Sequence, residues 1–120
     1  VLLKDINKGD KIGYGCTFHA QKNMKIAIIQ CGYADGIPID FSNNGYVFYN
    51  KFKFPIIGRV SMDLICIDIT SYNEENKIDK VVIWGGKNKY SRLEYIAKNF
   101  NTIPYVYLTG ITSRVEKEYV

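Results

Sequence analysis

The sequence predicts a mostly β fold: a compact, antiparallel β-barrel-like domain with one α-helix at about residues 91–99. Three observations lead to this prediction. Short runs rich in β-branched and aromatic residues recur along the chain, turn residues separate these runs, and a single segment has helical periodicity. With 120 residues, of which 47% are hydrophobic, the chain is long enough for one domain with its own core.

Strand-like runs account for most of the chain before residue 90. The stretch "GYVFYNKFKF" at 45–54 predicts a hairpin that turns at Asn50-Lys51, because asparagine tolerates the left-handed conformation such a turn needs. Pro55 suits the first position of a strand or an edge strand, since it cannot donate a hydrogen bond. The other predicted strands lie at residues 1–6, 11–20, 25–31, 54–60, 64–70, 80–86 and 105–115.

The predicted helix begins with a Ser-x-x-Glu capping box formed by Ser91 and Glu94. Apolar residues then recur at helical spacing, at Leu93, Ile96, Ala97 and Phe100. The polar stretch 71–79 is predicted to be a surface loop, because strands are predicted on both sides of it. Many short strands with one helix favour a β-barrel or sandwich of a single domain.

The net charge of +4 comes mostly from scattered lysines. Lysines interleave with aromatic residues in "YNKFKF", which is compatible with a nucleic-acid-binding barrel face. A hairpin with one solvated lysine face explains the same pattern, and we favour that interpretation. We therefore expect no nucleic-acid partner.

Cysteine and histidine are too few and too dispersed for a metal site. Cys16, Cys31 and Cys66 form no Cys-x-x-Cys pair, and His19 is the only histidine. We expect three reduced thiols and no metal. The apolar run "KIAIIQC" is far shorter than the roughly 20 residues of a membrane-spanning helix, so no membrane partner is expected.

Two tyrosines lie next to glycines in predicted turns. Tyr14 lies within "KIGYG", and Tyr33 lies within "GYADG", directly after an apolar run. A neighbouring glycine removes bulk and lets a ligand approach the backbone closely. Taken singly, either tyrosine is more often a packing residue than a catalytic one, and Met62 in "GRVSMD" would be core filler.

The order and spacing of several motifs resemble the C-terminal domain of alanine racemase. They are "KIGYG", "GYADG", "GRVSMD" about 25 residues later, "TIPY" and "ITSR", and the resemblance extends from Lys8 to Val115. It implies that residues 1–120 are a single C-terminal β-domain and that an N-terminal TIM-type barrel is absent from this chain. The start at Val1, without a methionine, likewise suggests a piece of a longer protein.

The resemblance also implies an activity. Alanine racemases use pyridoxal 5′-phosphate to interconvert L-alanine and D-alanine for peptidoglycan synthesis, and they are cytoplasmic homodimers. The cofactor is bound through a lysine of the barrel domain, so the isolated fragment is expected to be inactive.

Four residues match functional positions of that family. Tyr14 matches the catalytic acid/base that reaches the partner subunit's site. Tyr33 matches a tyrosine that narrows the substrate passage, and Met62 a residue whose backbone N–H binds the substrate carboxylate. Tyr105 matches a tyrosine that hydrogen-bonds the cofactor phosphate. We expect Tyr14, Tyr33 and Met62 to lie on an exposed, partly apolar surface, with Asp35 and Gly36 shaping the turn.

One departure leaves the substrate open. Many relatives have an arginine near the entrance where this chain has Ile39. A racemase for serine, lysine or a broader set of amino acids therefore stays an alternative. A second alternative is a non-catalytic β-barrel binding module, and a third is a dimerisation domain whose tyrosines only pack.

Overall fold

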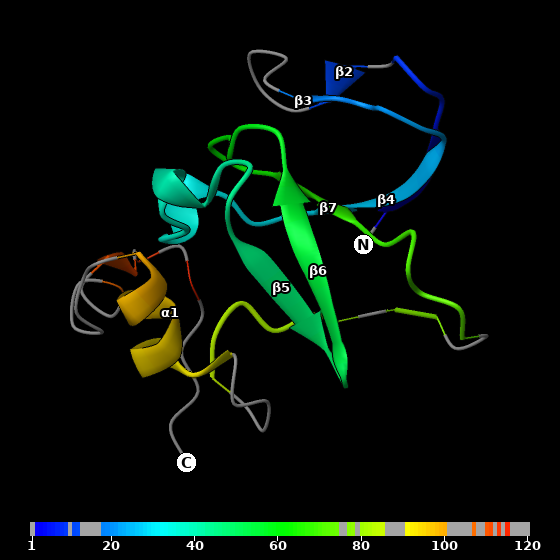
Figure 1. The fold of residues 1–120 in the computed structure, drawn as a ribbon. Coiled ribbons are helices and arrows are strands. Elements are labelled where there is room, and N and C mark those ends of the chain that lie inside the picture. Colours follow the sequence, from blue (N-terminus) through cyan, green and yellow to red (C-terminus); the bar gives the residue numbers. More distant parts are fainter. Residues whose placement is uncertain are drawn as a thin grey trace.

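The central feature of the fold is a five-stranded antiparallel sheet, seen in a computed structural model that describes residues 2–9, 11–12, 18–74, 77–78, 80–85, 91–100, 107, 110–111, 113 and 115 (Figure 1). The strand order is β1-β4-β7-β6-β5, and every pair is antiparallel. The strands are β1 (Leu2–Ile6), β4 (Met24–Ile29), β5 (Tyr46–Tyr49), β6 (Phe52–Ile57) and β7 (Ile65–Asp68).

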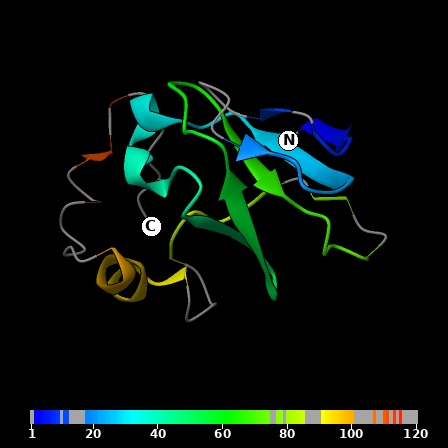
Figure 2. The same ribbon diagram turned by 45° about the horizontal axis from the view of Figure 1, so that its top comes forward.

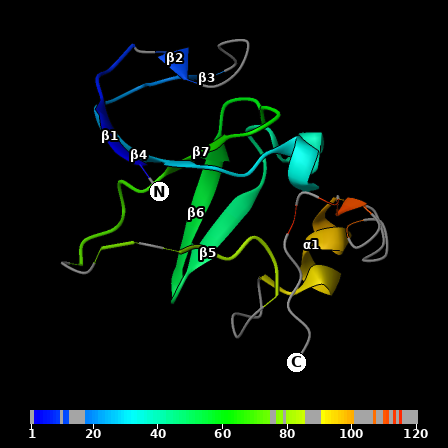
Figure 3. The ribbon, with the colours of Figure 1, turned by 180° about the vertical axis from the view of Figure 1, so that it is seen from behind.

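A mostly β, antiparallel fold is thus confirmed, and one α-helix has defined bounds within the described residues. Within the described residues the sheet does not close into a barrel, since β1 and β5 form its two edges. In the view from behind, β4 and β7 run across the β5–β6 hairpin (Figure 3). Helix α1 (Leu93–Asn99) lies beside that hairpin, on the side away from β1 (Figure 2).

The β5–β6 hairpin forms as predicted. Asn50 has the left-handed conformation, with φ 50°, and the turn joins paired strands of opposite direction. Pro55 lies inside β6, not at its first position. The β6–β7 ladder starts only at Ile56, so Pro55 pairs with β5 alone and occupies a local edge that tolerates its missing N–H.

The described part of the region predicted as one strand at 11–20 consists of two short paired strands. Strand β2 (Lys11–Ile12) pairs with β3 (Phe18–His19) in a separate two-stranded sheet. The prediction of a strand at 80–86 is wrong for residues 80–85, which the structure describes. These residues contribute only one isolated bridge, between Val82 and Phe48. At the C-terminal end, Tyr107 and Gly110 have helical backbone instead of the predicted extended conformation.

The predicted capping box is also wrong. Helix α1 has Arg92 as its N-cap, without a side-chain capping bond. Ser91 is buried, and its hydroxyl donates a hydrogen bond to the carbonyl of Gly85. The predicted apolar face is confirmed, since Ile96 and Ala97 are buried in the core and Leu93 and Phe100 pack against it.

The main core lies between the sheet, α1 and the loops after β4. Its members that are at most 2% exposed come from strands β4 to β7, from α1 and from the connecting loops: Ala27, Phe41, Val47, Phe54, Ile56, Val60, Ile65, Ile67, Ile78 and Ala97. Tyr49, Phe52 and Tyr72 extend this core as a cluster of edge-to-face rings. Burial raises the pKa of Tyr72 above its ordinary value of 10.0, and Tyr49 raises it further through its charge and a hydrogen bond.

This raised pKa predicts a loss of stability in alkali. Because the phenol of Tyr72 ionises less readily in the folded state than in the unfolded state, its contribution is complete below pH 10 and falls as the pH rises above 10 through the folded pKa. Urea unfolding of the protein and of Tyr72→Phe from about pH 9 to about pH 11 tests this. The variant should lose less stability across that range, and a constant offset at neutral pH reports the lost hydrogen bond separately. Parallel pH curves would contradict the prediction.

Candidate functional site

The "GYADG" segment forms a tight turn directly after β4. Its centre is a short 3-10 helix, Tyr33–Asp35, whose start is closed by a hydrogen bond from the Gly32 N–H to Asp35 Oδ2 (3.0 Å). Gly36 ends the turn with φ 109°, a left-handed conformation that L side chains rarely adopt, and donates to the Tyr33 carbonyl (3.1 Å). Asp35 and Gly36 therefore shape the turn, as expected.

Strand pairing brings this turn against the "GRVSMD" segment. Strands β4 and β7 are neighbours, and Ile29 near the end of β4 pairs with Ile65 at the start of β7. The chain that leaves β4 consequently meets the chain that enters β7. The Tyr33 N–H donates to the Ser61 carbonyl (2.9 Å), and the Ala34 N–H donates to the Met62 carbonyl (3.1 Å).

The two segments touch so closely that Gly32 has no space for a side chain. A Cβ atom at this position would collide with the carbonyl oxygens of Ser61 and Met62. The turn after β4 and the turn before β7 are thus one interlocked unit. We call residues 32–36 together with 61–64 the turn face.

Ser61 supports the second half of the turn face. Its N–H and its hydroxyl both donate to the Leu64 carbonyl, at 3.1 and 2.9 Å, and its Oγ accepts from the Leu64 N–H. Upstream, Ser42 Oγ accepts from the Val60 N–H (2.8 Å). These bonds hold a compact turn with Met62 and Asp63 at its tip.

The side chains of Tyr33 and Met62 project from this face into solvent. Tyr33 is 45% exposed and Met62 is 52% exposed, and the neighbouring Leu64 is exposed as well. The exposure expected for Tyr33 and Met62 is confirmed. The face is partly apolar, which is typical of a surface that contacts another protein segment or a ligand. Tyr14 and Tyr105 lie outside the described residues.

A cavity of about 310 Å³ opens beside Tyr33. Close packing of the chain forms one wall, since a Cβ on Gly36 would lie 2.8 Å from the Gly110 carbonyl oxygen. Burial raises the pKa of Tyr107, and the nearby Asp40 carboxylate raises it further. The cavity is lined by Tyr33, Gly36, Ile37, Pro38, Asp40, Phe100, Tyr107 and Gly110.

Sequence reasoning missed Asp40 and Tyr107 as members of this cavity. Tyr107 follows "TIPY" by two residues, and it packs against Phe41 and Trp84 with ring centroids 5.9 and 5.5 Å away. Its place beside the "GYADG" turn depends on contacts between distant parts of the chain that no local pattern indicates. Ile39, at the entrance position, is 55% exposed at the start of the 3-10 helix Ile39–Phe41.

Cys31 and Cys66 are half-buried, and neither forms a disulfide within the described part of the chain. Across the ranges that the structure describes, no three potential metal-binding side chains gather in one place. In the same ranges, no helix has the length and apolarity needed to cross a membrane.

The antiparallel sheet, helix α1 and the interlocked turn face together define a β-rich domain. The chain belongs to the family "Alanine racemase, C-terminal domain", whose sequence model matches residues 1–119. It is 47% identical over 113 residues to an alanine racemase from Vesicomyosocius okutanii. This alignment covers 94% of this chain and 31% of that protein. It is 42% identical over 121 residues to one from Brucella ovis, covering all of this chain and 30% of that protein.

Solved structures agree with this membership. The chain matches an alanine racemase from Bartonella henselae with covalently bound pyridoxal phosphate, with a TM-score of 0.87 at 34% identity. That match covers 98% of this chain and 32% of the other. A biosynthetic alanine racemase from Pseudomonas aeruginosa matches with a TM-score of 0.86 at 30% identity, covering 99% and 32%. The chain thus spans about a third of the length of these relatives.

Proposed function

We propose that this chain is the C-terminal domain of a pyridoxal-phosphate-dependent alanine racemase that supplies D-alanine for peptidoglycan. The observation that supports this most directly is the turn face, because it exposes Tyr33 and Met62 together from motifs 29 residues apart in the sequence. Family membership supplies the reaction. The complete enzyme works as a cytoplasmic homodimer, and each copy of this domain completes the active site of the partner subunit.

Tyr14 moves a proton at the α-carbon of the substrate. Racemisation needs a proton removed from one face of that carbon and returned to the other, so it requires two groups on opposite sides. The bound cofactor supplies an electron sink that makes this proton acidic. Tyr14 serves one face, and a lysine of the barrel domain serves the other. Since a free phenol has a pKa near 10, Tyr14 depends on neighbouring groups to act at neutral pH.

Met62 binds the substrate carboxylate through its backbone. Its carbonyl already accepts a hydrogen bond from Ala34, whereas its N–H makes none to the described part of the chain. An N–H at the tip of a rigid turn is a suitable donor to a carboxylate. The exposed Met62 side chain then forms part of the apolar surround, and Tyr33 narrows the passage to the site.

The described residues are better suited to line the cofactor site than to bind the phosphate group of the cofactor. The charged side chain in the cavity beside Tyr33 is Asp40, which would repel a phosphate. Tyr105 and the barrel domain are therefore the groups that we assign to the phosphate, and the barrel lysine holds the cofactor.

A racemase for another amino acid is the second candidate. The observation in its favour is Ile39, an exposed apolar residue at a position where relatives carry an arginine. An apolar residue at the entrance does not select amino acids by charge. The entrance would therefore admit amino acids with larger side chains than that of alanine.

The test of the proposed function uses a complete enzyme that contains this chain. Purified with pyridoxal phosphate, the enzyme should convert L-alanine to D-alanine, measured by chiral chromatography, while the 120-residue chain alone should show no racemisation. Faster turnover of serine or lysine than of alanine would favour the second candidate. Racemisation by the chain alone would contradict the proposal that the barrel domain is needed to bind the cofactor.

The passage role of Tyr33 gives a separate prediction. Tyr33→Ala should raise kcat/KM for serine or lysine relative to alanine by about 10-fold, since one carbon's difference in fit is worth about 10–200-fold in discrimination. Tyr46→Ala is the matched control, because Tyr46 is similarly exposed, at 41%, but lies on β5 outside the turn face. An equal change in both variants, or none in Tyr33→Ala, would remove Tyr33 from the passage.

A further inference from the structure

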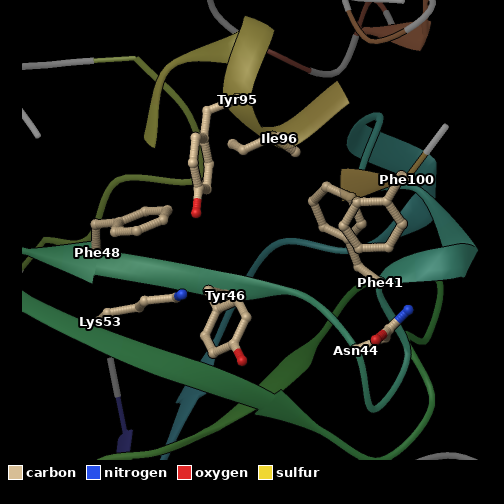
Figure 4. A pocket seen from close by; sticks show the side chains of 8 residues that line it. All are labelled: Phe41, Asn44, Tyr46, Phe48, Lys53, Tyr95, Ile96 and Phe100. Carbon is tan, nitrogen blue, oxygen red and sulfur yellow. The ribbon is translucent and has the colours of Figure 1, made fainter. Parts of the chain in front are cut away.

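Two polar residues, Ser42 and Asn43, bind the segment that leads from β6 to the turn face. They follow the short 3-10 helix Ile39–Phe41, whose last residue anchors them in the core. Phe41 is 1% exposed, and its ring centroid lies 4.8 Å from that of Phe100 (Figure 4). The Ser42 N–H closes this helix by donating to its first carbonyl (2.9 Å). Ser42 and Asn43 are therefore held in a fixed position in the fold.

Three hydrogen bonds join these two residues to the segment after β6. The Asn43 N–H donates to the Gly58 carbonyl (3.1 Å), and the Gly58 N–H donates back to Asn43 Oδ1 (2.6 Å). The Val60 N–H donates to Ser42 Oγ (2.8 Å). Asn43 and Gly58 both have the left-handed conformation, with φ 55° and 74°. We call Ser42 and Asn43, with these three hydrogen bonds, the clasp.

The clasp supplies acceptors to two N–H groups in the interior. Gly58 is buried and Val60 is 1% exposed, so little of either residue is open to water. A buried N–H without an acceptor costs free energy, and the loss of either side-chain oxygen should therefore make the segment shift. The clasp thus fixes the chain two residues before Met62.

The direction of the Met62 N–H is fixed from the opposite side. This N–H and the Ser61 carbonyl belong to one peptide unit, which is planar and trans, so the two groups point in opposite directions. The Ser61 carbonyl accepts from the Tyr33 N–H (2.9 Å). The Met62 N–H consequently points away from the turn after β4. The clasp on one side and Tyr33 on the other leave this peptide unit little freedom to rotate.

We propose that Ser42 and Asn43 are positioning residues that hold the Met62 N–H in line with the substrate carboxylate. The proposal rests on the carboxylate-binding role proposed above for Met62. Each side chain acts through the backbone of residues 58–60 and does not itself touch the substrate. A displaced donor makes a weaker charge-assisted hydrogen bond, because the bond weakens as its distance and angle depart from the optimum.

This role predicts a particular kinetic signature. The substrate carboxylate does not react, so a hydrogen bond to it acts equally in the ground state and in the transition state. Loss of such a uniform contact raises KM and leaves kcat nearly unchanged. A loss of general stability or of proton transfer would lower kcat instead.

The test uses a complete enzyme that contains this chain and changes one side chain of the clasp at a time. Asn43→Gly removes the oxygen that accepts from Gly58 and keeps the left-handed backbone, which glycine adopts freely. It should raise KM for alanine by about 10-fold, as for one lost charge-assisted hydrogen bond, and change kcat by less than about 2-fold. Ser42→Ala should act in the same direction, and it carries the test if Asn43→Gly does not fold.

Two further variants separate positioning from general destabilisation. Asn43→Asp keeps an oxygen in the place of Oδ1, so it should retain the original KM. Asn50→Gly is the matched control, since Asn50 also has a left-handed backbone, φ 50°, but lies at the other end of β6 from Gly58. It should leave both KM and kcat unchanged. Thermal melts compare the stability of all the variants.

Ligand binding gives a measurement that needs no turnover. Propionate is alanine without its amino group, and ethylamine is alanine without its carboxylate. In calorimetric titrations of the enzyme purified with pyridoxal phosphate, Asn43→Gly should bind propionate about 10-fold more weakly than the original enzyme. Its affinity for ethylamine should be unchanged. A purely structural role of the clasp would weaken both ligands equally.

Three results would overturn the clasp proposal and leave the racemase assignment intact: an unchanged KM in Asn43→Gly and Ser42→Ala, an equal rise of KM in Asn43→Asp and Asn43→Gly, or equal weakening of propionate and ethylamine. A parent enzyme that racemises no amino acid would contradict the proposed function, and the clasp proposal with it. The two failures are distinguishable because every amino acid carries the carboxylate, so KM can be measured with whichever one the enzyme converts.

Discussion

Replacing Tyr14 by phenylalanine in a complete enzyme should lower alanine racemisation by about 10²–10⁴-fold, the usual contribution of a general acid/base. That loss corresponds to roughly 3–5 kcal/mol of transition-state stabilisation. The substitution removes only the hydroxyl and leaves the ring, so cofactor binding and thermal stability should stay near those of the original enzyme. Racemisation rates in both directions, with cofactor absorbance and a thermal melt as controls, measure the effect.

The loss should also be one-sided. Two groups on opposite faces of the α-carbon exchange its hydrogen independently, so the variant keeps the exchange that the barrel lysine performs. In deuterated water, exchange of the α-hydrogen of D-alanine should persist, while exchange from L-alanine nearly stops. The assignment of the L face to the tyrosine rests on the resemblance to the family. Equal and modest losses from both enantiomers would make Tyr14 a packing residue.

The second large effect is expected at Gly32. Gly32→Ala should destabilise the protein by about 3 kcal/mol, since the new methyl group collides with two backbone carbonyls that cannot move independently of the β4–β7 ladder. The collision should also separate the two halves of the turn face and weaken the Tyr33–Ser61 and Ala34–Met62 hydrogen bonds. Urea unfolding measures the first effect, and amide hydrogen exchange at Tyr33 and Ala34 measures the second.

Gly9→Ala is the control for Gly32→Ala, because it tests the cost of backbone strain without a steric collision. Gly9 has φ 93°, which disfavours alanine, but a Cβ there meets nothing within 4 Å. Gly32 has φ −143°, which any residue adopts, so its cost is contact alone. Gly9→Ala should therefore cost about 1–2 kcal/mol without affecting exchange at Tyr33. A smaller loss at Gly32 than at Gly9 would contradict the interlocked turn face.

The elements that the sequence predicted correctly depend on neighbours along the chain. The hairpin at Asn50 needs only a residue that tolerates positive φ between two alternating runs. Helix α1 needs only apolar residues at helical spacing. In both cases the decisive interactions join residues at most a few positions apart, and so a local pattern carries the information.

The predictions that failed depend on distant partners. Residues 80–85 have the composition of a strand, yet only Val82 finds a bridge, to Phe48 on β5. Ser91 has the spacing of a capping residue, but its hydroxyl donates to the Gly85 carbonyl instead. A side chain or a strand segment bonds to whichever group tertiary packing brings nearest, and the sequence alone does not give that proximity.

For the candidate site, the sequence by itself was enough to recognise the family motifs. It was also enough to predict that Asp35 and Gly36 shape the turn. The resemblance to the family led us to expect Tyr33 and Met62 on one exposed surface, but no local pattern indicated how they meet, since no contact between residues 32–34 and 61–62 is local. That meeting exists because β4 and β7 pair side by side, which brings the chain leaving one strand against the chain entering the other. Tertiary structure alone also placed Asp40 and Tyr107 beside Tyr33 and brought Asn43 against Gly58, because each requires segments far apart in sequence to pack together.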